Sequence, residues 1–181
     1  MEQTKKGFTL VELLIVIGIL GILAAAVVVV LNPAELLKQA RDSKRMQDLV
    51  SIDSALGLYL VSTSTPNVGD GAINITQTAG GCDEGATPGV VATRTTDGAG
   101  WVNVDLDELT GGSPLSVLPI DPTNSGTYAY CYMGSSTPLT WELAAILEST
   151  KFGTTDNLDA IDGGTDDTVY EIGSDLSLIT N

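Results

Sequence analysis

The sequence contains no histidine. Histidine is the commonest general base and the commonest side-chain metal ligand, so its absence excludes His-ligated haem and every catalytic triad that needs an imidazole. The chain also lacks a Gly-x-Ser-x-Gly motif, a phosphate-binding loop and a Cys-x-x-Cys pair, which are signatures of several enzyme classes. We therefore expect that the chain is not an enzyme and that it needs no cofactor, apart from the calcium ion considered below.

Positive charge is scarce in most of the chain. The sequence has 8 Lys and Arg against 23 Asp and Glu, which gives a formal net charge of −15. Beyond Arg45 the only basic residues are Arg94 and Lys151, against 19 acids. Nucleic-acid binding requires Lys and Arg to neutralise phosphates, so we expect no nucleic-acid partner. The acidity is typical of an exported domain that stays soluble.

Cysteine is almost absent as well, with only Cys82 and Cys131. An even count in an exported domain predicts one disulfide. It would close a loop of about 50 residues and contribute about 4 kcal/mol in the chain-entropy model. Two free buried thiols are the alternative, which would fit a cytosolic domain.

One long apolar run is present near the N-terminus, in "KKGFTLVELLIVIGILGILAAAVVVVL" (residues 5–31). Only Glu12 is charged between Phe8 and Leu31. A helix from Leu10 to Leu31 would be roughly 33 Å long, enough to cross the hydrocarbon core of a bilayer. A cleaved secretory signal is the competing interpretation, but the run is too long for one and contains a carboxylate.

The charges on the two sides of the apolar run favour opposite orientations in a membrane. Lys5 and Lys6 favour a cytoplasmic N-terminus, whereas the basic residues 38–45 on the other side favour the opposite orientation. The expected disulfide and the acidic domain both suit an exterior location. We therefore expect a single pass through the cytoplasmic membrane with the N-terminus inside.

A second helix should follow the apolar run. Asn32-Pro33 predicts a kink or a brief break, because proline removes a helix hydrogen bond and disfavours helix in the preceding residue. The helix then resumes, with apolar residues spaced three or four apart that predict a buried stripe. The members of this stripe are Leu49, Ile52, Leu56 and Tyr59.

Basic and acidic residues alternate at the start of this second helix. The basic residues are Lys38, Arg41, Lys44 and Arg45, and the acids are Glu35, Asp42 and Asp48. We interpret the basic residues as a solvated helix face. The alternative is contact with anionic lipid headgroups or with the acids of a neighbouring subunit.

From about residue 66 the composition becomes rich in Gly, Thr, Ser, Asp and Asn, which predicts loops with weak strands. The runs "TYAYCYM" and "LTWELAAIL" predict two strands joined by the turn "GSSTP", although the second run would also suit a helix. Tyr128, Tyr130 and Tyr132 should share one face of the sheet. A last strand is expected near "TVYEI", and "GWVNVDLDEL" is expected to be a short strand or a turn.

The distal acidic stretch offers oxygen ligands for a structural calcium ion. Its spacing does not match an EF-hand loop, and a solvated acidic loop is the simpler interpretation. The candidate ligands are Asp156, Asp159, Asp162, Asp166 and Asp167.

The segment "KKGFTLVELLIVIGILGILAAA" resembles the N-terminus of type IV pilins and pseudopilins. Gly7 matches the last residue of the family's leader peptide, Phe8 the first mature residue, and Glu12 the glutamate at the fifth mature position. The distal "LPIDPTNSGTYAY" resembles the Pro-x-Asp-Pro and Tyr-x-Tyr stretch of major pseudopilins of type II secretion. Pro33 departs from the family, in which a proline often lies about four residues earlier.

The resemblance implies an α+β fold, with a long N-terminal helix whose second half packs on a small antiparallel sheet. It implies a leader at 1–7, a transmembrane or filament-core helix at 8–33, an amphipathic helix at 34–62 and a loop-rich β-sheet domain at 63–181. A prepilin peptidase would cut after Gly7 and methylate the amine of Phe8. Identical subunits would then leave the membrane lipid through an inner-membrane assembly platform and form a helical homopolymer outside.

The resemblance thus predicts a structural subunit of a pilus-like surface filament. A major pseudopilin of a type II secretion system and a monomeric membrane-anchored binding protein are the alternatives. An unpaired charge at the centre of a bilayer helix costs roughly 2.5–3.5 kcal/mol, so either the segment does not lie in lipid or Glu12 has a partner. The alternative is a carboxyl group that is protonated or reaches the cytoplasmic interface, since Glu12 is close to the helix start. Cleavage places a positive amine on Phe8, four residues away, and the resemblance implies that in a filament a neighbouring subunit supplies this amine.

Overall fold

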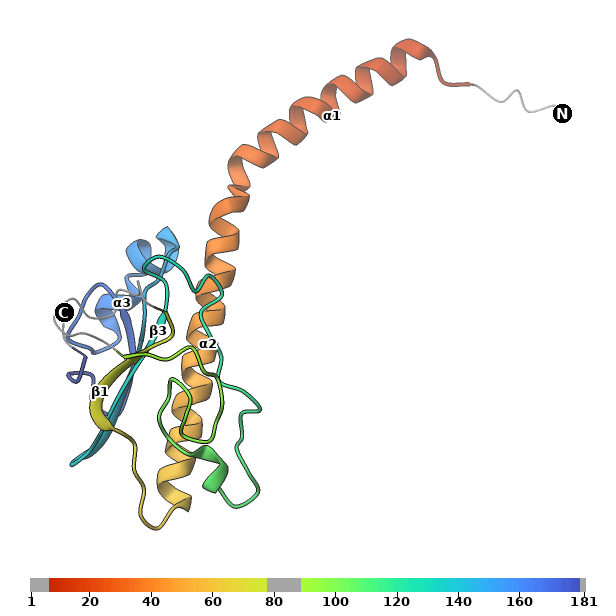
Figure 1. Cartoon of the computed structure of the whole chain (residues 1–181). Coiled ribbons are helices and arrows are strands. Elements are labelled where there is room, and N and C mark those ends of the chain that lie inside the picture. Colours follow the sequence, from red (N-terminus) through yellow and green to blue (C-terminus); the bar gives the residue numbers. More distant parts are fainter. Residues whose placement is uncertain (1–6, 78–88, 180–181) are drawn as a thin grey trace. The chain divides into compact units, whose positions relative to one another are not determined.

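The computed structural model describes residues 7–77 and 89–179 (Figure 1). The chain divides into two compact units, Met1–Leu37 and Lys38–Asn181. Cys82 lies outside the described residues, while Cys131 is buried in a strand of the second unit. The Cys82–Cys131 disulfide therefore stays a prediction.

Helix α1 spans Leu10–Leu31 and has no buried residue. Among the described residues, it supplies the one stretch that is long and apolar enough to cross a membrane, judged by length and composition. The helix ends at Asn32, which has a left-handed backbone conformation with φ 39°. Helix α2 begins at the next residue and spans Pro33–Ser62. The break lies where the sequence predicts it, because Pro33 lacks an N–H and fits the first position of a new helix.

The second unit contains a five-stranded sheet with the strand order β2-β1-β3-β4-β5. The β1–β2 pair is parallel, and the other three neighbouring pairs are antiparallel. The predicted hairpin is confirmed, with Tyr130 opposite Ala145, and so is the expected last strand. The strands are β1 (Asp70–Ile75), β2 (Gly89–Val90), β3 (Tyr130–Ser136), β4 (Leu139–Ala145) and β5 (Tyr170–Gly173).

Two segments outside the sheet form short helices. Residues 101–110 are bends and turns around the 3₁₀ helix η1, Leu106–Glu108, which agrees with the turn expected there. The acidic stretch expected to be a loop contains a π-helical turn η2, Lys151–Thr155, and a single-turn helix α3, Leu158–Ile161.

The two faces of the sheet bury different side chains. Tyr130 and Tyr132 point to the face covered by α2, where the predicted helix stripe forms the main core. Cys131 lies on the opposite face in a smaller apolar cluster. Tyr128 precedes β3, so only two of the three tyrosines share a face within the strand. The stripe residues Leu49, Ile52, Leu56 and Tyr59 are all buried.

Two carboxyl groups lie buried side by side on β4 and β5. Glu142 is fully buried, and its Oε2 accepts backbone hydrogen bonds of 2.8 Å from Leu178 and 2.9 Å from Ile179. Glu171 is also buried, and its Oε2 accepts a 3.2 Å bond from the backbone N–H of Asp166. No Lys or Arg in the described ranges forms an ion pair with either group. Burial, together with a hydrogen bond to Glu171, raises the pKa of Glu142 to about 8.

This pair makes the stability of the second unit depend on pH. A carboxyl group whose pKa is raised on folding stabilises the fold fully below its unfolded value of 4.5, and the contribution is lost as the pH rises through about 8. We expect Glu142→Gln to keep the hydrogen bonds without ionising. At pH 8 it should raise the free energy of unfolding by on the order of a few kcal/mol, with little change at pH 4.5.

Tryptophan fluorescence during urea unfolding of the full chain in detergent measures this effect, because Trp101 and Trp141 both lie in the core of the second unit. Glu108→Gln is the matched control, since Glu108 is exposed. Equal pH profiles for Glu142→Gln and the unmodified chain would contradict the prediction.

Candidate functional site

Glu12, the one charge in the apolar run, has a partner within its own helix turn. Thr9 is the N-cap of α1, and its hydroxyl accepts a 3.2 Å hydrogen bond from the backbone N–H of Glu12. In return, the Oε2 atom of Glu12 accepts bonds of 3.0 Å from the Thr9 backbone N–H and 2.8 Å from its hydroxyl. This reciprocal arrangement is a capping box, which satisfies two backbone donors at a helix start.

The capping box changes the interpretation of Glu12. In this structure the partner of Glu12 is Thr9, and not the amine that the sequence predicted. The Thr-x-x-Glu spacing is the local signal that could have found it. Both bonds to the carboxylate end on Oε2, and Oε1 has no hydrogen-bond partner within residues 7–77 and 89–179. The capping box therefore orients the carboxylate and leaves one oxygen free to accept a further donor.

The predicted cleavage site directly precedes this cap. Gly7 and Phe8 lie outside the helix in non-helical backbone, and both are exposed. A peptidase needs an accessible substrate segment outside a helix, and this stretch provides one. The structure thus places Gly7, Phe8 and Glu12 within one short segment at the start of α1.

The surface of α1 is apolar on every side. All its large hydrophobic side chains are exposed, from Leu10 through Leu31. A soluble helix would show one apolar stripe, whereas a helix that is apolar all round requires lipid or other helices around it. Gly18 and Gly21 have open space where a side chain would be, so another helix can approach closely there.

The basic segment at the start of α2 is only in part the solvated face that the sequence favoured: Lys44 is exposed, whereas Arg45 is not. Arg45 is completely buried, and its Nε and Nη2 atoms donate to the two carboxylate oxygens of Asp121, at 2.6 and 2.9 Å. Its Nη1 atom donates to Asp42 at 2.7 Å and to Glu148 at 2.9 Å. Arg41 pairs with Glu148 too. The expectation was wrong for Arg45, because three acids compensate its charge.

Two parts of the distal pseudopilin-like stretch meet at this cluster. Asp121, the bidentate partner of Arg45, is the aspartate of "LPIDP". The ring of Tyr128 lies 4.9 Å from the guanidinium carbon of Arg45, and the hydroxyl of Tyr130 donates to Asp48 at 3.0 Å. The Pro-x-Asp-Pro and Tyr-x-Tyr residues therefore fasten the sheet and its loops to α2.

The expected calcium ligands form no metal-binding group among the described residues. Asp159 is buried in α3, whereas Asp156 and Asp167 are exposed. Asp162 accepts backbone hydrogen bonds of 2.6 Å from Glu171 and 2.9 Å from Gly164. Across the described ranges, no group of three or more acidic or cysteine side chains is placed to hold a metal ion. This arrangement gives the calcium prediction no geometric support, and it stays a prediction.

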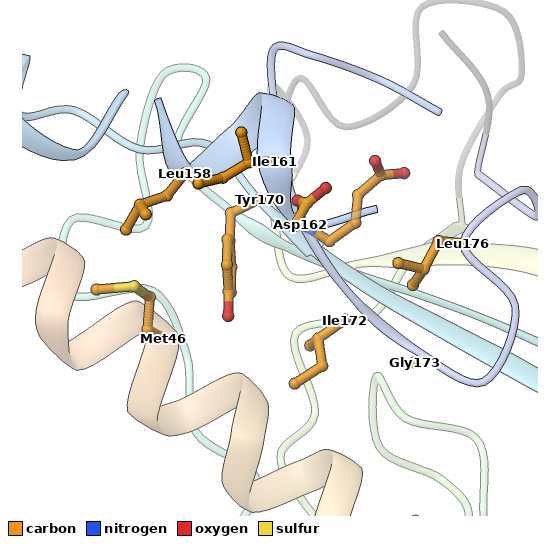
Figure 2. Close-up of a pocket in the computed structure, with 9 residues that line it drawn as sticks. Met46, Leu158, Ile161, Asp162, Tyr170, Ile172, Gly173 and Leu176 are labelled. Carbon is orange, nitrogen blue, oxygen red and sulfur yellow. The ribbon is translucent and has the colours of Figure 1, made fainter. Parts of the chain in front are cut away.

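A groove opens between α2 and the edge strand β5 (Figure 2). Met46 of α2 faces Leu158 and Tyr170 across it, and Ile161 lies on the α3 side. The cavity measures about 480 Å³. Its lining is mainly apolar and consists of Met46, Leu158, Ile161, Asp162, Tyr170, Glu171, Ile172, Gly173 and Leu176. We call this the α2–β5 groove.

These features define a class of protein: an α+β domain that carries an N-terminal apolar helix built for lipid or for a helix bundle. Residues 3–28 match the family model described as the prokaryotic N-terminal methylation motif. The N-terminal segment of the chain is therefore similar to that of type IV pilins and type II secretion pseudopilins, as the sequence indicated.

Curated relatives are similar in sequence to this chain over part of their length. The chain is 39% identical over 64 residues to the type II secretion system core protein G of Dickeya chrysanthemi, covering 35% of this chain and 40% of that protein. It is 40% identical over 62 residues to the protein of the same name from Klebsiella pneumoniae, covering 34% and 43%. The matches thus span less than half of these relatives. No solved structure matches the chain significantly.

The buried cluster predicts how the second unit responds to loss of Arg45. Arg45→Met should lower the free energy of unfolding by about 3–5 kcal/mol, because it leaves Asp42, Asp121 and Glu148 without a buried counter-charge. Lys38→Met is the matched control, because Lys38 lies on the same helix and forms no ion pair within the described residues; its loss should cost less than about 1 kcal/mol. Urea unfolding followed by tryptophan fluorescence measures both. Equal stability of the two variants would refute the role of the cluster.

Proposed function

We propose that the chain is a structural subunit of a type IV pilus-like filament, processed after Gly7 and polymerised through α1. The observation that carries the proposal is α1 itself, 22 residues long with no buried side chain and one oriented carboxylate at its start. Such a helix is stable in lipid before assembly and in a bundle of identical helices afterwards. The methylation-motif match supports the processing step.

Within this class, a major pseudopilin of type II secretion is the kind of subunit that the observations favour. The relatives carry the name type II secretion system core protein G. The Pro-x-Asp-Pro and Tyr-x-Tyr stretch, which resembles that of major pseudopilins, is part of the cluster around Arg45. A surface pilus is the second candidate, because both kinds of subunit share the N-terminal motif. Deleting the gene separates them: a pseudopilin loss stops protein secretion, and a pilin loss removes surface filaments.

Assembly would begin in the cytoplasmic membrane with the N-terminus inside. The prepilin peptidase would release residues 1–7 and methylate the amine of Phe8. The inner-membrane assembly platform would then move subunits into a filament in the periplasm or outside the cell. No catalytic step is assigned to this chain, since its role is to pack against copies of itself.

Glu12 gives this assembly a register. Thr9 holds one carboxylate oxygen and leaves the other free. Cleavage creates a positive amine on Phe8, and a neighbouring subunit can present this amine to the free oxygen. A charge in an apolar medium is strongly destabilised unless it is paired, so a correctly placed neighbour is favoured and a misplaced one leaves two unpaired charges.

Processing gives the first test. We expect mature protein to begin at Phe8 with a methylated amine, because the exposed Gly7–Phe8 bond follows a basic leader. Intact-mass measurement of membrane-extracted protein shows the cleavage and the added methyl group. Gly7→Leu should leave uncleaved precursor in the membrane, while Gly18→Leu, which lies within α1, should be cleaved normally. A mature start near Val27 would instead indicate an ordinary signal peptide.

Assembly gives the second test, and two substitutions separate charge from capping. Glu12→Val removes both, and Glu12→Gln keeps a capping-box side chain without the charge. We expect both variants to be cleaved and inserted, yet to yield at least tenfold less sedimentable filament, because an unpaired amine opposes packing at roughly 1.4 kcal/mol or more per contact.

Detergent-free sedimentation of sheared material measures filament yield. Normal yield from Glu12→Gln would show that capping, not charge pairing, is the role of Glu12. If the unmodified and correctly cleaved chain forms no sedimentable polymer, the filament proposal fails, and a monomeric membrane-anchored protein becomes the better interpretation.

A further inference from the structure

The α2–β5 groove leaves apolar side chains uncovered beside a strongly acidic segment. Ile161 is 68% exposed, and Met46, Tyr170 and Ile172 are partly exposed along the groove. Covering such apolar surface is favourable, because it removes the surface from water. Because β5 is an edge strand of the sheet, nothing within the sheet covers this side of it.

The charge around the groove limits what can bind there. Residues 152–179 contain seven acids and no Lys or Arg. Asp162 lies at the rim, beside the apolar side chains of α3 (Figure 2). An anionic lipid surface or a nucleic acid would be repelled by this segment. The groove therefore suits a partner that presents apolar side chains next to a positive charge.

The start of α2 presents such a combination. Leu37 is 61% exposed, Leu36 is also exposed, and Lys38 follows them directly. Arg41 and Arg45 form ion pairs with acids of their own chain, but Lys38 has no ion-pair partner among the described residues. Val61 is more exposed, at 88%, yet no basic residue lies near it in the sequence.

We propose that the α2–β5 groove of one copy receives Leu36, Leu37 and Lys38 from a second copy. The leucines cover the apolar floor, and Lys38 lies against the acidic rim. The proposal rests on the proposed filament function and names one of its contact surfaces. Since the two contacting surfaces differ, the contact is heterologous, and its repetition builds an open helical assembly rather than a closed dimer.

Cysteine cross-linking of the full chain tests this pairing directly. We expect Leu37→Cys combined with Ile161→Cys to give a ladder of multimers on mild oxidation, because each copy then links its start of α2 to the groove of the next. Both replaced side chains are largely exposed, so folding should be retained. Either single substitution should give dimers at most, and the unmodified chain controls for Cys82 and Cys131.

Val61→Cys combined with Ile161→Cys is the matched control, since Val61 is exposed at the other end of α2 and should give no ladder. Adding Lys38→Glu to the Leu37/Ile161 pair should lower the cross-link yield about two- to fivefold, the range of an exposed ion pair. The experiment is run on native membranes and on sheared filaments in parallel.

The outcomes separate the contact from the function. A Leu37–Ile161 ladder in either fraction supports the contact. No ladder in both fractions, or equal ladders from the pair with Val61, overturns it. Filaments that sediment normally without a ladder leave the filament function intact and reject only this contact. A ladder in membranes without sedimentable filaments counts against the filament function and not against the contact.

Discussion

The buried guanidinium of Arg45 joins the two layers of the globular unit. It lies on α2 and bonds to Asp121, before the sheet hairpin, and to Glu148, after it. A buried charge tolerates little displacement, because any lost partner leaves an uncompensated ion. The helix is therefore held at a fixed position along the sheet, and the apolar stripe from Leu49 to Tyr59 packs in the register that this cluster sets.

The composition of helix α1 is set by a different constraint, namely the surroundings of its surface. In the proposed function the helix has to be stable among lipid chains and among helices, and both surroundings are apolar. This explains why its composition is uniform around the helix, in contrast to the striped α2. The same constraint makes Glu12 informative: the one carboxylate is kept at the first turn, where a capping box can satisfy it before any partner arrives.

Local patterns in the sequence predict those features that depend on neighbours along the chain. The spacing of Leu49, Ile52 and Leu56 predicts the buried side of α2, and Asn32-Pro33 predicts the helix break. The Thr9–Glu12 capping box has a readable local pattern as well. The short strands β1 and β2 carry little such signal, because they are brief and lie among glycines and threonines.

Features that depend on distant residues could not be predicted in this way. Arg45 contacts acids 76 and 103 positions away, and nothing in the sequence around it distinguishes it from Lys44, which reaches solvent. The burial of Glu142 and Glu171 could not be predicted either, because it also depends on residues distant in the sequence. An isolated glutamate in a strand suggests a solvent-facing position. The α2–β5 groove could not be predicted, because its lining comes from α3, β5 and Met46, which are far apart in the sequence.

In the proposed membrane-inserted state, the break at Asn32 limits how deeply the chain can lie in a bilayer. Pro33 has no N–H to donate to the carbonyl of Val29, four residues earlier, and Asn32 leaves the helical conformation. The hydrocarbon core offers no water to satisfy such a carbonyl. A break at the headgroup level avoids this cost, and the roughly 33 Å of α1 is long enough to fill the hydrocarbon core beside it. In that proposed state, Asn32 and Pro33 mark the boundary between the membrane-spanning segment and the helix that continues into the globular unit.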